Sequence, residues 1–219
     1  MKEINIIDFG LMGKQISALF YLLGYEIGVY NKSKLNIYKF EKQIELLQRK
    51  IDFSNFNAGK INIYQHIEDL KNSLTIESLN EDLNLKKEIM QILRDNNIVF
   101  SNSSSLSMDD LNCDFIHFFN TIYIKLIELC GSNLERFTPL KDLKKLGFHI
   151  ICSKGNRGAL ANLLLFNEIS SFFKIIEKYD YNFKECQTVY DLLYEKRNLL
   201  NIIDTIGIEL CNKICKNLK

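Results

Sequence analysis

The chain has 219 residues, of which 47% are hydrophobic and 25% charged, a composition typical of a globular protein of one or two domains. Its formal net charge of +1 argues against a nucleic-acid binder with a basic face. It has no run of about 18 apolar residues and no signal-peptide pattern at its N-terminus, so we expect no membrane span and no membrane partner. The six cysteines show no CxxC spacing and several lie in apolar runs, which predicts reduced thiols in a cytoplasmic protein without a metal site.

The first 30 residues predict a strand, a glycine-containing turn, a helix and a second strand. Residues 3–7 form a short apolar strand, which is followed by Asp8-Phe-Gly-Leu-Met-Gly13. Apolar residues then recur at helical spacing over residues 16–23, and residues 26–30 form the next strand. This order is that of the first βαβ unit of a dinucleotide-binding fold.

Strands and helices continue to alternate after this unit. We expect helices over 34–51, 82–94 and 133–146, and strands over 60–64, 74–77, 97–100 and 148–152. From Gly158 onward only helical patterns appear, over 160–178, 183–197 and 199–218. The predicted fold class is therefore α/β, with a Rossmann-like domain at residues 1–152 and a small all-helical domain at residues 153–219.

The apolar stretch from residue 115 to residue 129 contains His117 and a single acidic residue, Glu128. If its two halves are strands that fold back around Ile122 and Tyr123, His117 and Glu128 face each other with Cβ atoms about 5 Å apart. A carboxylate that holds one imidazole nitrogen raises the basicity of the other, which is the arrangement of a proton-transfer pair. The alternative is a buried histidine that a structural acid satisfies. His66 and His149 have no expected partner and are interpreted as structural.

The turn Asp8-x-Gly10-x-x-Gly13 is a dinucleotide fingerprint without its first glycine. Gly10 lets the backbone approach a pyrophosphate, Gly13 lets the helix pack closely on the strand, and the helix start at Leu11 and Met12 offers free N–H groups. Asp8 places a carboxylate near the phosphates. We therefore expect weakened cofactor binding or an adapted turn.

The second strand ends in Asn31, Lys32 and Ser33, where an NAD-binding fold normally has an acid for the ribose. An amide tolerates a phosphate better than a carboxylate does, and Lys32 and Ser33 could bind one, which favours NADP. The alternative is that Asn31 or Ser33 only caps the following helix.

Five further polar positions are candidates for either a structural or a functional role. Ser103, Ser104 and Ser105 follow a strand at the ligand-binding edge, but at least one of them is expected to be only a loop or cap residue. Glu77 could cap the helix that follows it. Asn162 lies in an apolar stripe, so it is either a polar tie in the core or a substrate contact.

Taken together, several blocks of residues resemble the 3-hydroxyacyl-CoA dehydrogenase family. The blocks are Gly10-Leu-Met-Gly13 with Gly24-Tyr25, Glu77-Ser-Leu-Asn-Glu-Asp-Leu83, Ser101-Asn-Ser-Ser-Ser-Leu106, His117-Phe-Phe-Asn120, Lys125-Leu-Ile-Glu128, Leu146-Gly147, Cys152, Gly158 with Asn162, and Ile203-Asp-Thr-Ile-Gly-Ile208. The resemblance implies a Rossmann-like domain followed by a helical domain through which the chain forms a homodimer. It also implies an acyl-CoA or acyl-carrier substrate and NAD or NADP as cofactor, with the preference undecided.

By this resemblance His117 is the proton-transfer residue and Glu128 its partner, and the implied reaction is hydride transfer between the nicotinamide and C3 of a 3-hydroxyacyl thioester. Ser104 and Asn162 are implied to donate hydrogen bonds to the substrate oxygen. The residues implied to contact the cofactor, besides the glycine turn, are Asn120, Glu77, Asp82 and Ser104.

The chain also departs from the family pattern. Asp8 and Asn31 replace a glycine and an acid, Thr121 replaces a proline, and Asn156-Arg157 replaces the proline at the entry to a short helical domain. A second hypothesis is therefore a degenerate member that serves as a non-catalytic binding or scaffold protein. We prefer the enzyme, because drift would more readily have lost the pair of His117 and Glu128 than kept it.

Overall fold

The structure is a computed structural model that describes residues 2–32, 37–94, 97–154, 158–194 and 199–218. The chain divides into two compact units, Met1–Ala159 and Leu160–Lys219. The predicted domain boundary after residue 152 lies a few residues before this division. Each unit is described by itself.

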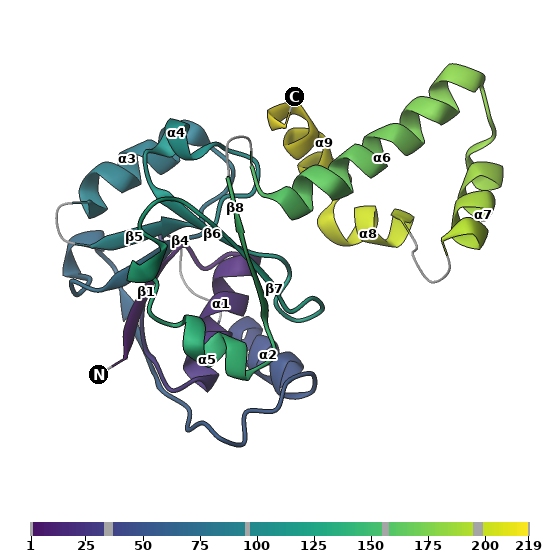
Figure 1. Cartoon of the computed structure of the whole chain (residues 1–219). Helices are drawn as coiled ribbons and strands as arrows, with labels where there is room; N and C mark the ends of the chain where they lie inside the picture. Colours follow the sequence, from purple (N-terminus) through teal and green to yellow (C-terminus); the bar gives the residue numbers. More distant parts are fainter. Residues whose placement is uncertain (1, 33–36, 95–96, 155–157, 195–198, 219) are drawn as a thin grey trace. The chain divides into compact units, whose positions relative to one another are not determined.

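The first unit is built on an eight-stranded sheet (Figure 1). Its strands are β1 (Glu3–Ile7), β2 (Glu26–Tyr30), β3 (Lys60–Tyr64), β4 (Leu74–Glu77), β5 (Ile98–Ser101), β6 (Asp114–Phe118), β7 (Leu126–Cys130) and β8 (His149–Ser153). They lie in the order β3-β2-β1-β4-β5-β6-β7-β8. The first six strands are parallel, β7 is antiparallel to β6, and β8 is parallel to β7. The strand order reverses between β1 and β4, which is where ligands bind in this architecture.

Helices cover both faces of this sheet (Figure 1). They are α1 (Leu11–Leu22), α2 (Ile37–Gln48), α3 (Leu83–Leu93), α4 (Met108–Leu111) and α5 (Leu140–Lys145). Side chains alternate along β1, so Ile4 and Ile6 join the core of α1, α2 and α5, whereas Ile7 packs with Ile89 and Leu93 of α3. Apolar residues on both faces of a central strand therefore produce the three-layer arrangement that the sequence predicts.

The second unit is entirely helical over its described residues, with α6 (Leu160–Tyr179), α7 (Phe183–Leu193), α8 (Leu199–Ile206) and α9 (Ile208–Asn217). An aromatic cluster joins α6 to α7, because the ring of Phe172 lies 6.2 Å from that of Phe183 and 5.4 Å from that of Tyr190. None of the helices described in either unit is both long and apolar enough to span a bilayer.

Three predicted helices differ from the observed ones. The helix expected over 133–146 is a short 3₁₀ turn, Leu134–Arg136, followed by α5, because Pro139 has no N–H with which to continue the first turn and instead precedes α5. The helix expected over 199–218 is broken into α8 and α9 at Gly207, whose φ of 92° lies in the left-handed region. The helix expected over 183–197 ends at Leu193, and residues 195–198 lie outside the described part of the chain.

Candidate functional site

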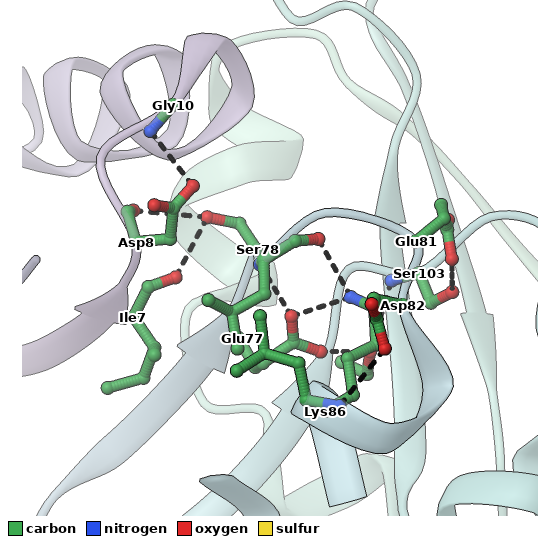
Figure 2. A network of polar contacts seen from close by, with 12 residues as sticks. Ile7, Asp8, Gly10, Glu77, Ser78, Glu81, Asp82, Lys86 and Ser103 are labelled. Atoms are coloured by element: carbon green, nitrogen blue, oxygen red, sulfur yellow. Dashed lines mark hydrogen bonds and ion pairs between the residues drawn. The ribbon is translucent and has the colours of Figure 1, made fainter. Parts of the chain in front are cut away.

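The glycine turn between β1 and α1 is shaped by Asp8 (Figure 2). Asp8 has a φ of 73°, the conformation for which a glycine is usually chosen. Its backbone N–H donates to Tyr30 O at 2.9 Å, and its Oδ2 accepts the backbone N–H of Gly10 at 3.1 Å. The turn has therefore adapted to a side chain, and that side chain now binds one of its own amides.

Gly13 sits where α1 packs closest to the turn. A Cβ atom at this position would lie 2.2 Å from Asp8 O and 2.8 Å from Ser78 Oγ, so no larger residue fits without a shift. Ser78 in turn donates to Ile7 O at 3.1 Å and to Asp8 O at 3.3 Å, which ties the segment after β4 to the turn after β1 (Figure 2). The predicted packing role of Gly13 is confirmed.

Asn31, at the end of β2, supports the same turn. Its Oδ1 accepts the backbone N–H of Phe9 at 2.9 Å, so its carbonyl serves the glycine turn and does not cap α2, which begins at Ile37. Lys32 is exposed beside it. Ser33 lies outside the described residues, so its predicted roles as phosphate ligand or helix cap stay predictions.

Glu77 at the end of β4 lies in a buried ion pair and has no exposed surface (Figure 2). Its Oε1 accepts from Lys86 Nζ at 2.6 Å and from Leu79 N at 2.5 Å, and its Oε2 accepts from Ser101 Oγ at 2.6 Å. The side chain of Lys86 is 1% exposed. The helix that Glu77 was expected to cap is capped by Asp82, so that alternative is wrong, whereas the predicted cofactor contact of Glu77 stays a prediction.

Asp82 caps the helix that Glu77 was expected to cap. Its Oδ1 accepts the backbone N–H groups of Asn84 and Leu85, each at 3.1 Å, at the start of α3. The prediction that Asp82 contacts a cofactor stays untested, although this exposed side chain already has a structural role.

Glu81 is a functional candidate that the sequence reasoning missed. Its carboxylate binds the serine loop after β5, because Oε2 accepts from Ser103 Oγ at 2.5 Å and Oε1 accepts from the backbone N–H of Ser104 at 2.8 Å. The Ser104 hydroxyl lies 3.4 Å from the same Oε1. The sequence did contain a signal for Glu81, because it is an acidic residue directly before the helix cap Asp82 and four residues after Glu77. The helix cap nearest the serine loop is Ser107, not one of Ser103–Ser105.

His117 and Glu128 are paired directly across the antiparallel strands β6 and β7, as the fold-back of residues 115–129 predicts. Both side chains are buried. The hydrogen bond expected between them is absent, because neither ring nitrogen of His117 has a hydrogen-bond partner among the described residues. The Glu128 carboxylate instead accepts from Ser153 Oγ of β8 at 2.5 Å.

Burial lowers the pKa of His117 below its usual value, and the carboxylates of Glu128 and Glu81, with a smaller effect of the Asn102 backbone, raise it only in part. The net direction is downward, so the imidazole is neutral at pH 7 and can accept a proton. Two acids, Glu128 on β7 and Glu81 in the segment between β4 and α3, thus act on one buried base, which is a common property of catalytic sites.

Asn120 follows β6 with a φ of 47°, and its Oδ1 is buried without a hydrogen-bond partner in the described part of the chain. Its backbone O accepts from Tyr123 N at 3.0 Å and from Ile124 N at 2.9 Å, which closes the turn to β7. Thr121 Oγ1 donates to Gln15 Oε1 of α1 at 3.2 Å, and this bond fastens the turn to the helix that begins at the glycine turn. A threonine in place of the family's proline therefore adds a tie within the site.

Among the predicted residues of the first unit, the structure brings together the glycine turn, the segment after β4 and the serine loop. The links are the bonds of Ser78 to Asp8, of Glu81 to Ser104 and of the Asn102 backbone N–H to Glu77 O at 2.7 Å. Asn102 Oδ1 then accepts from Phe118 N at 2.9 Å, next to His117. Asn162 lies in the first turn of α6, in the second unit, and its predicted substrate contact stays a prediction.

Comparison with known proteins identifies relatives of this arrangement. The curated 3-hydroxybutyryl-CoA dehydrogenase of Clostridioides difficile is 28% identical over 156 residues, which cover 60% of this chain and 55% of that protein. The chain thus spans little more than half the length of that relative. In fold it is similar to FadB2 of M. tuberculosis, with a TM-score of 0.82 at 18% identity, and to the (S)-3-hydroxybutyryl-CoA dehydrogenase PaaH1 of Ralstonia eutropha, with a TM-score of 0.80 at 21% identity. Each comparison covers 100% of this chain and 87% of the other.

The sequence model of one family matches residues 3–136, which include the glycine turn, Glu81, the serine loop and the pair of His117 and Glu128. That match confirms the resemblance inferred from the sequence and supports the use of NAD or NADP. The chain belongs to the family described as 3-hydroxyacyl-CoA dehydrogenase, NAD binding domain.

Proposed function

We propose that the chain is an NAD(P)-dependent oxidoreductase that transfers hydride between the nicotinamide and C3 of a 3-hydroxyacyl or 3-oxoacyl thioester. The observation that carries this proposal is the pairing of buried His117 with Glu128 at the sheet edge that also holds the glycine turn and the serine loop. Family membership supports the reaction type. The thioester is linked to CoA or to a carrier protein, and the name of the relative from C. difficile favours CoA.

In this proposal His117 moves the proton. Its lowered pKa keeps the imidazole neutral, so a ring nitrogen can accept the proton of the substrate's 3-hydroxyl group in the oxidative direction and return it in the reductive direction. The resulting imidazolium is buried, and the negative charge of Glu128 on the neighbouring strand stabilises it.

Ser104 and Asn162 position the substrate oxygen. The bond from the Ser104 backbone N–H to Glu81 holds the serine loop, whereas the Ser104 hydroxyl makes only a 3.4 Å contact with Glu81. So long a bond is weak, and the hydroxyl can turn to donate to the substrate oxygen. Asn162 would supply the second donor from α6.

The residues of the glycine turn fit a dinucleotide. Gly10 and Gly13 lack side chains where the backbone must approach closely, and no side chain caps the helix at Gly10, so the N–H groups at Leu11 and Met12 can bind phosphate oxygens. Asn31, Lys32 and Ser33 would hold the ribose end, and Asn120 the nicotinamide end. When bound, the cofactor supplies a hydride acceptor at C4 of its nicotinamide.

The test is a titration of purified protein with NADH and NADPH by fluorescence, followed by the reduction of 3-oxobutyryl-CoA monitored by absorbance of the reduced cofactor. We expect dissociation constants below about 1 mM for at least one cofactor and measurable turnover. A preference for NADPH would assign a phosphate-binding role to Lys32 and Ser33. Absence of binding at millimolar cofactor, or binding without turnover on thioesters of either carrier, would favour the scaffold hypothesis.

The proposed enzyme is a homodimer that associates through its helical unit. Leu199 and Ile203 of α8 are apolar, but they are buried within the chain and are not available to a second subunit. Exposed apolar side chains occur instead on α7, where Leu192 is 76% exposed, Leu193 71% and Val189 55%. Such a patch on one helix face is typical of a surface that a second subunit covers.

We therefore expect Leu192→Glu to convert a dimer to a monomer in sedimentation velocity experiments, because it places a charge in an apolar interface. Lys184→Gln is the matched control: it changes the charge of α7 by the same amount at an exposed position away from Leu192, and it should remain dimeric. A wild-type monomer, or a dimer that survives Leu192→Glu, would exclude this face.

A further inference from the structure

The carboxylate of Asp8 binds a backbone amide of the glycine turn, an interaction that the family resemblance does not explain. Its Oδ2 lies 3.1 Å from the backbone nitrogen of Gly10 and accepts that N–H group (Figure 2). The contact is short enough that a Cβ atom at Gly10 would lie only 2.8 Å from the same oxygen. The carboxylate thus lies in direct contact with the backbone of the turn at Gly10.

In this architecture the backbone N–H groups of such a turn donate hydrogen bonds to the pyrophosphate of a bound dinucleotide. A carboxylate oxygen has the same charge sign and the same hydrogen-bonding capacity as a phosphate oxygen. The first turn of α1 carries no acidic residue of its own, so Asp8 is the negative group at this helix start. Asp8 therefore already makes the interaction that the proposed cofactor requires.

We propose that Asp8 competes intramolecularly with the cofactor's pyrophosphate for the Gly10 amide, and that Lys14 receives the carboxylate when it is displaced. The inference rests on the proposed dinucleotide site. It makes Asp8 the residue that sets cofactor affinity in this chain, and it explains how the turn remains compatible with phosphates although a carboxylate replaces the first glycine.

Lys14 is placed for this role. Its Nζ donates to Gly10 O at 3.1 Å, on the peptide that Asp8 also engages. Burial and the charge of Lys39 lower the pKa of Lys14, whereas the charge of Asp8 raises it, so the ammonium group and the carboxylate are within electrostatic range. In the proposal, the displaced Asp8 side chain turns away from the Gly10 amide and toward this cation.

The first test compares Asp8→Gly and Asp8→Asn with wild type in NADH binding, measured by fluorescence titration at low ionic strength. Both variants should bind about tenfold more tightly, because each removes a negative charge from the phosphate site, and glycine also suits a φ of 73°. Asp52→Asn, which alters a carboxylate in the loop before β3, is the matched control and should change affinity by less than about twofold. Equal affinity in wild type and both Asp8 variants would overturn the competition.

The second test introduces Lys14→Met into the wild-type chain and into Asp8→Gly. Lys42→Met, at an exposed position on α2, is the control. We expect Lys14→Met to weaken NADH binding about threefold to tenfold in the wild-type chain, and by less than about twofold in Asp8→Gly. In Asp8→Gly there is no displaced carboxylate for Lys14 to bind. An equal loss in both backgrounds would mean that Lys14 binds the phosphate directly and would overturn its proposed role.

A third readout needs neither cofactor nor turnover. Inorganic pyrophosphate should shift the ¹⁵N amide resonance of Gly10 at a lower concentration in Asp8→Asn than in wild type, and an unchanged concentration dependence would contradict the competition. The two proposals fail differently. Tighter binding in the Asp8 variants without turnover in any variant removes the proposed reaction only, whereas turnover with unaltered affinity removes the competition only.

Discussion

Replacing His117 with glutamine is expected to reduce kcat by about 10²–10⁴-fold and to change the dissociation constant of NADH by less than about twofold. The imidazole is buried opposite Glu128, so its loss removes the proposed proton acceptor and leaves the glycine turn intact. Steady-state reduction of 3-oxobutyryl-CoA and fluorescence titration measure the two quantities.

The matched control is His149→Gln, because His149 is an exposed histidine on β8 in the same sheet, and it should leave kcat unchanged. The pH profile gives a second readout. Since the pKa of His117 lies below its usual value, the base is neutral at higher pH, and kcat/KM for oxidation should fall only as the pH drops below about 6.5. Wild-type turnover in His117→Gln, or an acidic limb that persists in it, would remove His117 from the mechanism.

Lys86→Met is expected to lower the free energy of unfolding by about 3–5 kcal/mol. The side chains of Lys86 and Glu77 are 1% and 0% exposed, and their charged atoms lie 2.6 Å apart. Removing the ammonium group leaves a carboxylate in the interior without its counterion, and only the Ser101 hydroxyl and the Leu79 amide remain to stabilise it. Urea unfolding followed by circular dichroism measures the loss.

The exposed pair of Glu45 on α2 and Arg49 just after that helix provides the comparison, because its charged atoms are 3.8 Å apart and its side chains 65% and 73% exposed. Arg49→Met should cost no more than about 0.5 kcal/mol. Adding Glu77→Gln to Lys86→Met should recover part of the loss, since no buried charge then remains. If Lys86→Met lowered the free energy of unfolding as little as Arg49→Met, the buried ion pair would not be the interaction that stabilises the segment after β4.

The strand pairing of the candidate site could be predicted from the sequence because it depends on local pattern. Two apolar strands separated by a short turn can bring one histidine and one acid opposite each other in only a few registers, and the observed register pairs His117 with Glu128. The βαβ unit and its glycine turn were predictable for the same reason. The predicted parallel sheet is confirmed for β1 to β6.

The roles of individual acids could not be predicted in this way, because they depend on contacts between residues far apart in the sequence. Glu77 and Glu81 lie in one polar segment, yet the first is paired with Lys86 and the second binds the serine loop. Nothing in their spacing distinguishes a buried partner from a loop partner. Pro139 and Gly207, in contrast, are helix-breaking residues in the sequence itself, and each interrupts a segment whose periodicity alone predicts a continuous helix.

Ser153 connects the proton-transfer pair to the path of the chain between its two units. Its hydroxyl is bonded to Glu128, and it is the last residue of β8, only a few residues before α6 begins at Leu160. A displacement of Ser153 would therefore reach the carboxylate opposite the imidazole through one hydrogen bond. Under the proposed function, a substitution at Ser153 would therefore alter the basicity of the imidazole without changing either His117 or Glu128.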